Sequence, residues 1–232
     1  SYAMRLIEDR LASSTALFLN GCAGNINPYP RGTFDLAARH GSELGAAVLK
    51  ALTSAGEIRK KGRISCVQHP VKLPLQAPES LEKSERDLAC VEREYRQIQG
   101  AHHENWTLAQ RYFTAKERVA AAREQDTAAS LPIEIQVIAI DDIALVGLPG
   151  EIFVETGFAI AAASPFAVTL PVGYANGSIG YVPTCEAVPD GGYEVIDARA
   201  RYRGRYIRAD ADRVLTQGAS AALAAAFARI DA

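Results

Sequence analysis

The strictest hydrophobic pattern in the chain is the alternation of apolar and polar side chains in residues 132–140 (PIEIQVIAI). A second apolar run, residues 143–147, follows directly after Asp141 and Asp142. A period of two is typical of a half-buried strand, and two such runs joined by two turn-forming residues predict a β-hairpin. The fold therefore contains at least one antiparallel pair of strands, with the two aspartates at its turn.

Helical and strand patterns are mixed along the rest of the chain, without a regular β-α alternation. Pro70 and Pro74 cannot donate to a β-ladder, so they place a strand over residues 64–75 at a sheet edge or in a bent strand. This mixture predicts the α+β class, with irregular mixed α/β layers. We expect helices that begin near Tyr2 and Thr33 and that cover residues 153–163 and 210–230, a buried strand over residues 15–20 and a further strand over residues 166–174.

Residues 78–129 differ from their surroundings because they are rich in long charged side chains. Apolar residues at helical spacing form two stripes within this segment. The segment is expected to be a helical hairpin inserted into the domain, turning within residues 100–105. Its outer faces are expected to be solvated, with a substrate lid or a docking arm as the alternative. The stripes consist of Leu88, Val91, Tyr95 and Ile98, then Trp106, Leu108, Tyr112 and Phe113.

Composition excludes several classes of protein. The 232 residues carry a net charge of -2, which leaves no basic excess for nucleic acid. The most continuous apolar stretch, residues 159–168, is about half the ~20 residues that a membrane-spanning helix needs, so a soluble protein is expected in an unassigned compartment. The four cysteines lie far apart without a Cys-x-x-Cys pair, and we expect mostly buried thiols in a reduced compartment.

Familiar catalytic motifs are missing, so candidate sites come from three loops. The first loop, residues 20–28 (NGCAGNINP), follows the expected strand of residues 15–20. Gly21 and Gly24 would let the backbone approach a ligand. Asn25 and Asn27 offer amides that can stabilise an oxyanion or clamp a substrate. A purely structural turn is the alternative for this loop.

The second and third loops carry a carboxylate and three phenols. Glu151 follows Pro149 and Gly150, where it is either a charge favoured by the first turn of a helix or a ligand facing a cavity. The third loop, residues 174–195, includes Tyr174, Tyr181 and Tyr193, and long ordered loops of this kind are usually functional. A basic string follows at residues 199–208, for which internal ion pairing is expected, with anion binding as the alternative.

Taken in order, these segments resemble the catalytic domain of the neutral, non-lysosomal ceramidase family and its bacterial relatives, from Tyr2 to about Ile207. In that family a strand leads to a Gly-Asp-Val-Ser-Pro-Asn loop, which residues 24–29 (GNINPY) match. A strand ending in Pro-x-Glu supplies a zinc-binding glutamate, which corresponds to Glu151. A Tyr-Glu pair supplies a zinc-binding tyrosine, which corresponds to Tyr193.

The resemblance implies a Zn²⁺ site completed by two histidines that lie upstream of Ser1. Residues 1–232 are accordingly expected to be the later portion of a ceramidase-like catalytic domain, whose partner is the N-terminal half of the same protein. Two residues depart from the family pattern. Asn27 replaces the catalytic serine and Asn25 replaces the neighbouring aspartate, so serine-assisted chemistry is not supported.

The resemblance implies a zinc-dependent hydrolase of an amide (N-acyl) or related bond in a small-molecule or lipid-like substrate. Asn25 and Asn27 would stabilise the oxyanion, with Tyr181 as a further donor, while Glu151 and Tyr193 would bind the metal. The alternative is a ligand-binding or structural relative that keeps the fold without turnover. A third possibility is a resemblance of fold alone, in a surface protein associated with carbohydrate or lipid.

Overall fold

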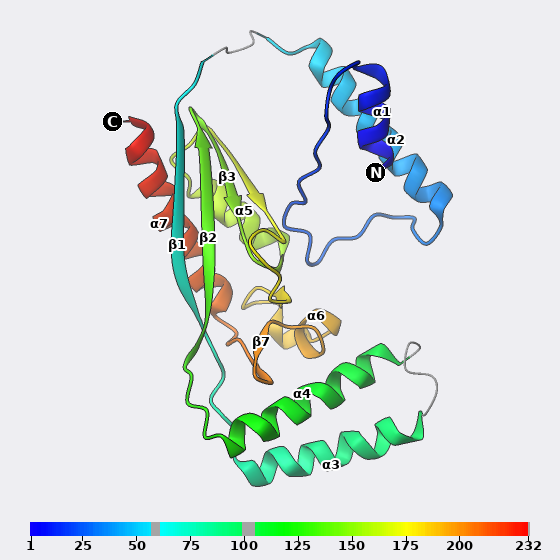
Figure 1. Ribbon diagram of the computed structural model, residues 1–232, viewed down its shortest axis with the longest axis vertical. Coiled ribbons are helices and arrows are strands. Elements are labelled where there is room, and N and C mark those ends of the chain that lie inside the picture. Colours follow the sequence, from blue (N-terminus) through cyan, green and yellow to red (C-terminus); the bar gives the residue numbers. More distant parts are fainter. Residues whose placement is uncertain (57–60, 99–104, 232) are drawn as a thin grey trace.

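The computed structural model describes residues 1–56, 61–98 and 105–231 and has an α+β architecture. Its central sheet has the strands β1 (Ile64–Pro74), β2 (Ser130–Ile140), β3 (Ile143–Gly147) and β5 (Val168–Val172). Their order is β1-β2-β3-β5, with only β3 and β5 parallel among the three pairings (Figure 1). The expected α+β class and the β-hairpin of β2 and β3 are therefore confirmed. β1 lies at a sheet edge, as its two prolines require.

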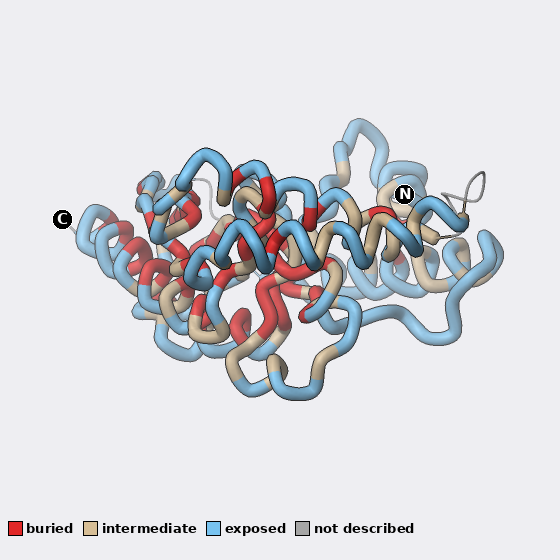
Figure 2. Tube along the Cα trace, turned by 90° about the horizontal axis from the view of Figure 1, so that it is seen from below, coloured by how far each residue is buried: buried red, intermediate tan, exposed pale blue. Residues whose placement is uncertain are grey.

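One face of the sheet forms the hydrophobic core. The alternating residues Val67, Val137 and Val146 lie side by side across β1, β2 and β3 and are buried. They face the closing helix α7 (Ala211–Asp231), which is rich in alanine and packs closely against β1 and β2. At Gly218 of α7, an added Cβ would lie 2.4 Å from a methyl group of Val71. Figure 2 shows buried residues concentrated in this half, whereas the end near the N-terminus is mostly exposed.

The other face of the same sheet is apolar at one end and exposed. Ile64, Ile140, Ile143 and Val168 form one cross-strand row, and each of them is exposed. The neighbouring row contains Leu170 together with residues of the other three strands. The regular register therefore places a continuous apolar patch on a surface that α7 does not cover.

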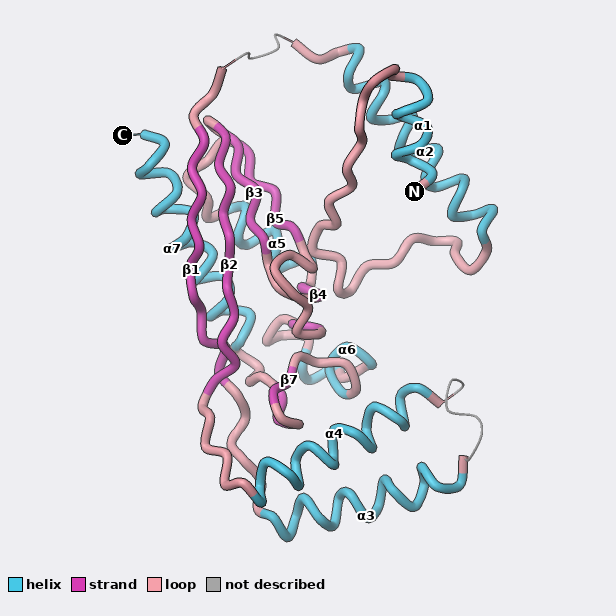
Figure 3. Tube along the Cα trace, in the orientation of Figure 1, coloured by secondary structure: helices cyan, strands magenta, loops and turns pink. Residues whose placement is uncertain are grey.

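The helical hairpin is confirmed. α3 (Leu81–Gln97) and α4 (Trp106–Arg123) pack against each other and are inserted between β1 and β2 (Figure 3). The rings of Tyr95 and Tyr112 stack with centroids 4.4 Å apart, which joins the two apolar stripes. Most of the expected turn lies in residues 99–104, which are outside the described part of the chain.

The first two helices form a separate pair. α1 (Tyr2–Arg10) and α2 (Phe34–Thr53) pack against each other at a distance from the sheet (Figure 1), and the side chain of Thr33 caps α2 as expected. The expected buried strand over residues 15–20 is wrong, because these residues have no regular structure. Leu17 is 85% exposed, and Phe18 is exposed beside it. An apolar run forms a strand only where another strand offers ladder partners.

The small elements after β3 surround the candidate site. α5 (Val154–Ala162) packs against α7, and the closing helix and α5 have nearly the expected bounds. Short elements lie immediately before α5 and between α5 and α7, and among them β4 and β6 are a parallel pair and β7 and β8 an antiparallel pair. These are β4 (Glu151–Ile152), β6 (Tyr181–Val182), the 3₁₀ helix η1 (Val188–Asp190), α6 (Tyr193–Ile196), β7 (Arg201–Tyr202) and β8 (Arg205–Tyr206).

Internal ion pairing of the basic string is largely confirmed, since Arg203 pairs with Glu124 and Asp126, and Arg208 pairs with Asp210. The expectation of mostly buried cysteines is wrong. Cys66 and Cys90 are exposed, because one lies on the uncovered face of the sheet and the other on the hairpin surface. In the described ranges, no helix combines the length and the apolar character needed to cross a membrane.

Candidate active site

Glu151 is held in a short strand rather than at the start of a helix. Its backbone N–H donates to the carbonyl of Gly180 at 3.0 Å, and β4 pairs with β6. The pairing uses the backbone of residues 151 and 152, so α5 begins only at Val154. The expectation that Glu151 opens the helix is therefore wrong, and the helix dipole does not explain its position.

The Asn-rich loop lies directly against this strand. The N–H of Gly24 donates to the carbonyl of Ile152 at 2.9 Å. A Cβ at Gly24 would lie only 2.5 Å from the carbonyl oxygen of Glu151, so no other residue fits without displacement. The sequence suggested that this glycine allows close approach to a ligand. In the structure it allows close approach to the backbone of Glu151.

The two asparagines of this loop have different surroundings. The Asn25 side chain accepts from the N–H of Val154 at 2.9 Å and donates to both carboxylate oxygens of Glu155. It therefore caps the start of α5 from a distant part of the chain. The Asn27 side chain is exposed, and its amide has no hydrogen-bond partner in the described part of the chain. The role of both asparagines at an oxyanion stays a prediction.

Three tyrosines surround Glu151. The hydroxyl of Tyr174 donates to Glu151 Oε2 at 2.7 Å, and the side chain of Tyr181 lines the same cavity as Glu151. The ring of Tyr193 meets the ring of Tyr181 nearly edge-on, with centroids 5.9 Å apart. The structure therefore brings Glu151, Tyr181 and Tyr193 together at one cavity, and their roles stay predictions.

Tyr174 belongs to the same cluster but was not among the predicted site residues. Its backbone has φ 56°, in the left-handed region, and its N–H donates to the carbonyl of Gly150 at 3.1 Å. Non-glycine residues in this region are uncommon and gather at functional sites. The signal in the sequence was the turn that follows, with Asn176 and Gly177, both of which also have positive φ.

Tyr174 and Tyr181 both hold their protons more tightly than a free tyrosine does. Burial raises the pKa of Tyr174 to about 12, and the hydrogen bond and charge of Glu151 act in the same direction. Burial and the same carboxylate also raise the pKa of Tyr181. At neutral pH both phenols are therefore protonated, and Tyr174 donates to the carboxylate.

A cavity of about 620 Å³ opens beside this cluster. Glu151, Tyr181 and Tyr193 line one side of it. Residues of α4 and β7 also line it, so the helical hairpin contributes a wall to the site. The volume lies in the range typical of pockets for small ligands.

Glu151 and Tyr193 fit part of a metal site. A carboxylate oxygen is an accepted zinc ligand, and the phenol oxygen of Tyr193 belongs to a side chain that lines the same cavity. Within residues 1–56, 61–98 and 105–231, no group of three or more His, Cys, Asp or Glu is arranged to hold a metal. The described residues thus offer two donors, whereas a catalytic zinc normally has at least three protein ligands.

Comparisons with known proteins point to a fold. No protein-family model and no curated protein matches the chain. It is similar to the crystal structure of neutral ceramidase from Pseudomonas aeruginosa, with a TM-score of 0.53 and 21% identity over 95% of this chain and 40% of that chain. It is also similar to a ceramidase complexed with C2, with a TM-score of 0.60 and 17% identity over 99% of this chain and 42% of that one. The chain spans about two-fifths of either structure and has a ceramidase-like fold.

Proposed function

We propose that the chain carries part of the active site of a zinc-dependent amide hydrolase, in which Glu151 and Tyr193 are two of the zinc ligands. The observation that carries this proposal is the convergence of Glu151, Tyr181 and Tyr193 at one cavity, with the Tyr174 hydroxyl donating to the same carboxylate. The ceramidase-like fold supports it, since ceramidases hydrolyse the amide bond of ceramide.

The chain's own residues have distinct tasks in this proposal. Tyr174 holds Oε2 of Glu151 and limits rotation of the carboxylate. Tyr181, which lines the cavity, donates a hydrogen bond to the negative charge that develops on the amide oxygen. A donor of this kind typically contributes about 2.7–4 kcal/mol to catalysis. Zinc, when bound, would supply Lewis-acid activation of water and of the carbonyl group.

The Asn-rich loop would support the same reaction. Asn27 has an amide without a partner in the described ranges and is the proposed donor to the oxyanion. Asn25 orients the loop, since its side chain ties the loop to Val154 and Glu155. This division of roles places the catalytic donor at the position where the ceramidase family has its serine.

The remaining zinc ligands are proposed to be two histidines from another segment of the same protein. The exposed apolar rows on the sheet and the exposed side chains of Leu17, Phe18 and Leu19 support a large partner surface. Contiguous apolar patches of this kind mark interaction sites. A segment that covers the sheet would also bring its own side chains toward the cluster around Glu151.

Zinc analysis of the full-length protein tests the ligand assignment. We expect about one zinc per chain, and markedly lower occupancy in Glu151→Gln and Tyr193→Phe with unchanged circular dichroism. The matched controls are Glu117→Gln and Tyr202→Phe, which remove the same groups from other positions in the lining of the cavity and should keep the metal. Full occupancy in both ligand variants would refute the assignment.

Activity is measured separately on a panel of N-acyl amides and esters. Loss of hydrolysis in the same variants that lose zinc supports the proposed zinc-dependent hydrolase. Stoichiometric zinc without hydrolysis of any panel member would instead favour the ligand-binding relative without turnover.

A further inference from the structure

The wall of the cavity that α4 and β7 form is polar. Gln110 and Glu117 lie seven residues apart on α4, which places them two turns apart on one helical face. Arg201 and Arg203, from β7 and the turn that follows it, complete this wall. A cavity for alkyl chains would need aliphatic side chains here, since charged groups lose hydration against an alkyl chain.

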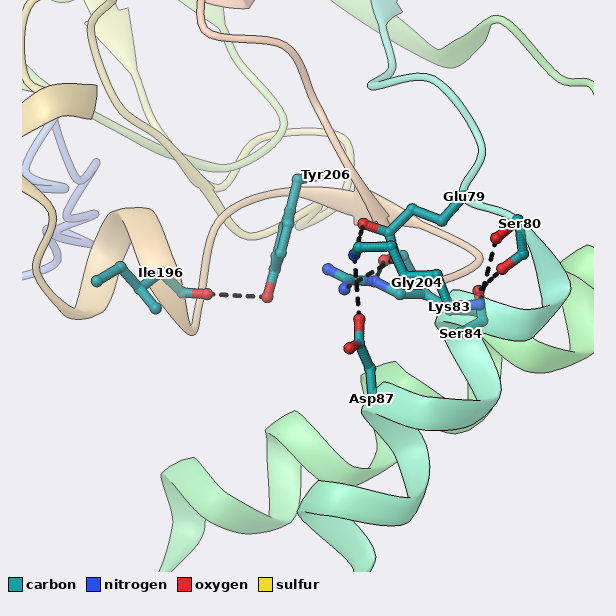
Figure 4. Close-up of polar contacts among 9 residues, drawn as sticks. Glu79, Ser80, Lys83, Ser84, Asp87, Ile196, Gly204 and Tyr206 are labelled. Carbon is teal, nitrogen blue, oxygen red and sulfur yellow. Dashed lines mark hydrogen bonds and ion pairs between the residues drawn. The ribbon is translucent and has the colours of Figure 1, made fainter.

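This wall is fixed to the rest of the domain. Gly204, with φ +73°, lies so close to α4 that an added Cβ would be 2.6 Å from the carbonyl oxygen of Thr114. Arg118 Nε donates to the carbonyl of Gly204 at 2.7 Å, and the Tyr206 hydroxyl donates to the carbonyl of Ile196 at 2.8 Å (Figure 4). The helical hairpin therefore forms a fixed wall of the cavity.

The two arginines of the wall differ in their pairing. Arg203 is neutralised by Glu124 and by Asp126. Arg201 makes longer contacts, at 4.0 Å to Glu117 Oε2 and 3.5 Å to the carbonyl of Asp197. Its guanidinium therefore retains hydrogen-bond capacity toward the cavity. This group can bind an anion with charge-assisted hydrogen bonds.

Gln110 is the second residue of this wall, after Arg201, with unused hydrogen-bond capacity. Its Oε1 atom is buried and has no hydrogen-bond partner in the described part of the chain. A buried acceptor without a partner costs free energy unless a ligand or a water supplies a donor. Because Gln110 lines the same cavity as Arg201, the wall presents an acceptor together with a cation.

We propose that this cavity binds N-acyl amino acids, whose amide N–H and carboxylate lie close together. Arg201 binds the carboxylate, and Gln110 Oε1 accepts from the amide N–H. The proposal rests on the proposed amide hydrolase and narrows its substrate class. In the reaction, water adds to the amide carbon, the C–N bond breaks and a proton moves to the nitrogen, which releases a carboxylic acid and an amino acid.

Substitution of Glu117 tests the proposal by whether it strengthens or weakens the binding of a carboxylate ligand. Its carboxylate lies beside Arg201 and competes with a bound anion. Glu117→Gln should therefore strengthen binding of a carboxylate ligand, and Arg201→Gln should weaken it. A cationic ligand held by Glu117 would respond to both substitutions in the opposite direction.

The experiment is calorimetric titration of the full-length protein with N-octanoylglycine and N-octanoylethanolamine, which share the acyl chain and differ in the carboxylate. We expect the glycine conjugate to bind roughly tenfold more tightly. Arg201→Gln should abolish this preference and Glu117→Gln should increase it. Arg208→Gln, which removes an exposed arginine paired with Asp210, should leave the preference unchanged.

Equal binding of the two compounds, or an unchanged preference in Arg201→Gln, would overturn the proposal. Because binding is measured without turnover, the result is separable from the proposed hydrolysis. A carboxylate preference that depends on Arg201 supports the binding site even if the compound is not cleaved.

Discussion

Gly24→Ala tests whether the Asn-rich loop positions Glu151. The added Cβ would lie 2.5 Å from the carbonyl oxygen of Glu151 and 3.0 Å from the carbonyl carbon of Ile152, whereas ordinary contact begins at 3.4 Å. The loop or β4 must therefore move by about 0.9 Å, the difference between 3.4 and 2.5 Å. Such a shift strains the hydrogen bond from Gly24 N–H to the carbonyl of Ile152.

We expect Gly24→Ala to lower the free energy of unfolding by about 1–3 kcal/mol, the usual cost of overpacking. Urea denaturation of the full-length protein measures this change, and zinc analysis shows whether the displaced Glu151 still binds the metal. Gly56→Ala is the matched control, because its added Cβ would meet no atom within 4 Å. If the two variants unfold at the same urea concentration, the close contact between the loop and β4 is not structurally important.

Three further predictions follow from the same contacts. The pKa of Tyr174 is raised to about 12 in the folded state, so the contribution of this phenol to stability is complete below the ordinary tyrosine pKa of 10 and is lost as pH rises toward 12. Denaturation at several pH values should show this loss of stability, and the loss should be smaller in Tyr174→Phe. Gly204→Ala should separate β7 from α4, and amide hydrogen exchange should show weaker protection in α4. Asn25→Ala should lower the free energy of unfolding by about 0.5–2 kcal/mol, because the cap on α5 is lost. Asn27→Ala should keep its stability and its zinc but lose turnover. Equal losses of stability in the two variants, measured by urea denaturation, would contradict the different roles.

Local patterns predicted most of the regular elements. The alternation in β2, the helical stripes of α3 and α4 and the alanine-rich run of α7 depend on neighbours in the sequence, and the structure confirms each of them. The failures have a common cause. Residues 15–20 have the composition of a strand, but no ladder partner is available to them in the described ranges. Cys66 is exposed because its face of the sheet is uncovered, which the alternation alone does not reveal.

Some features of the candidate site were likewise predictable from the sequence, and others were not. The sequence by itself determined which residue types stand in the three loops and, through their order and spacing, the resemblance that singled out Glu151 and Tyr193. Only the tertiary structure decided that Tyr174 donates to Glu151, that Asn25 caps α5 from 129 residues away and that α4 forms a wall of the cavity. These contacts join segments far apart in the chain. Their partners are set by the packing of close-fitting backbones at Gly24 and Gly204, which no local periodicity encodes.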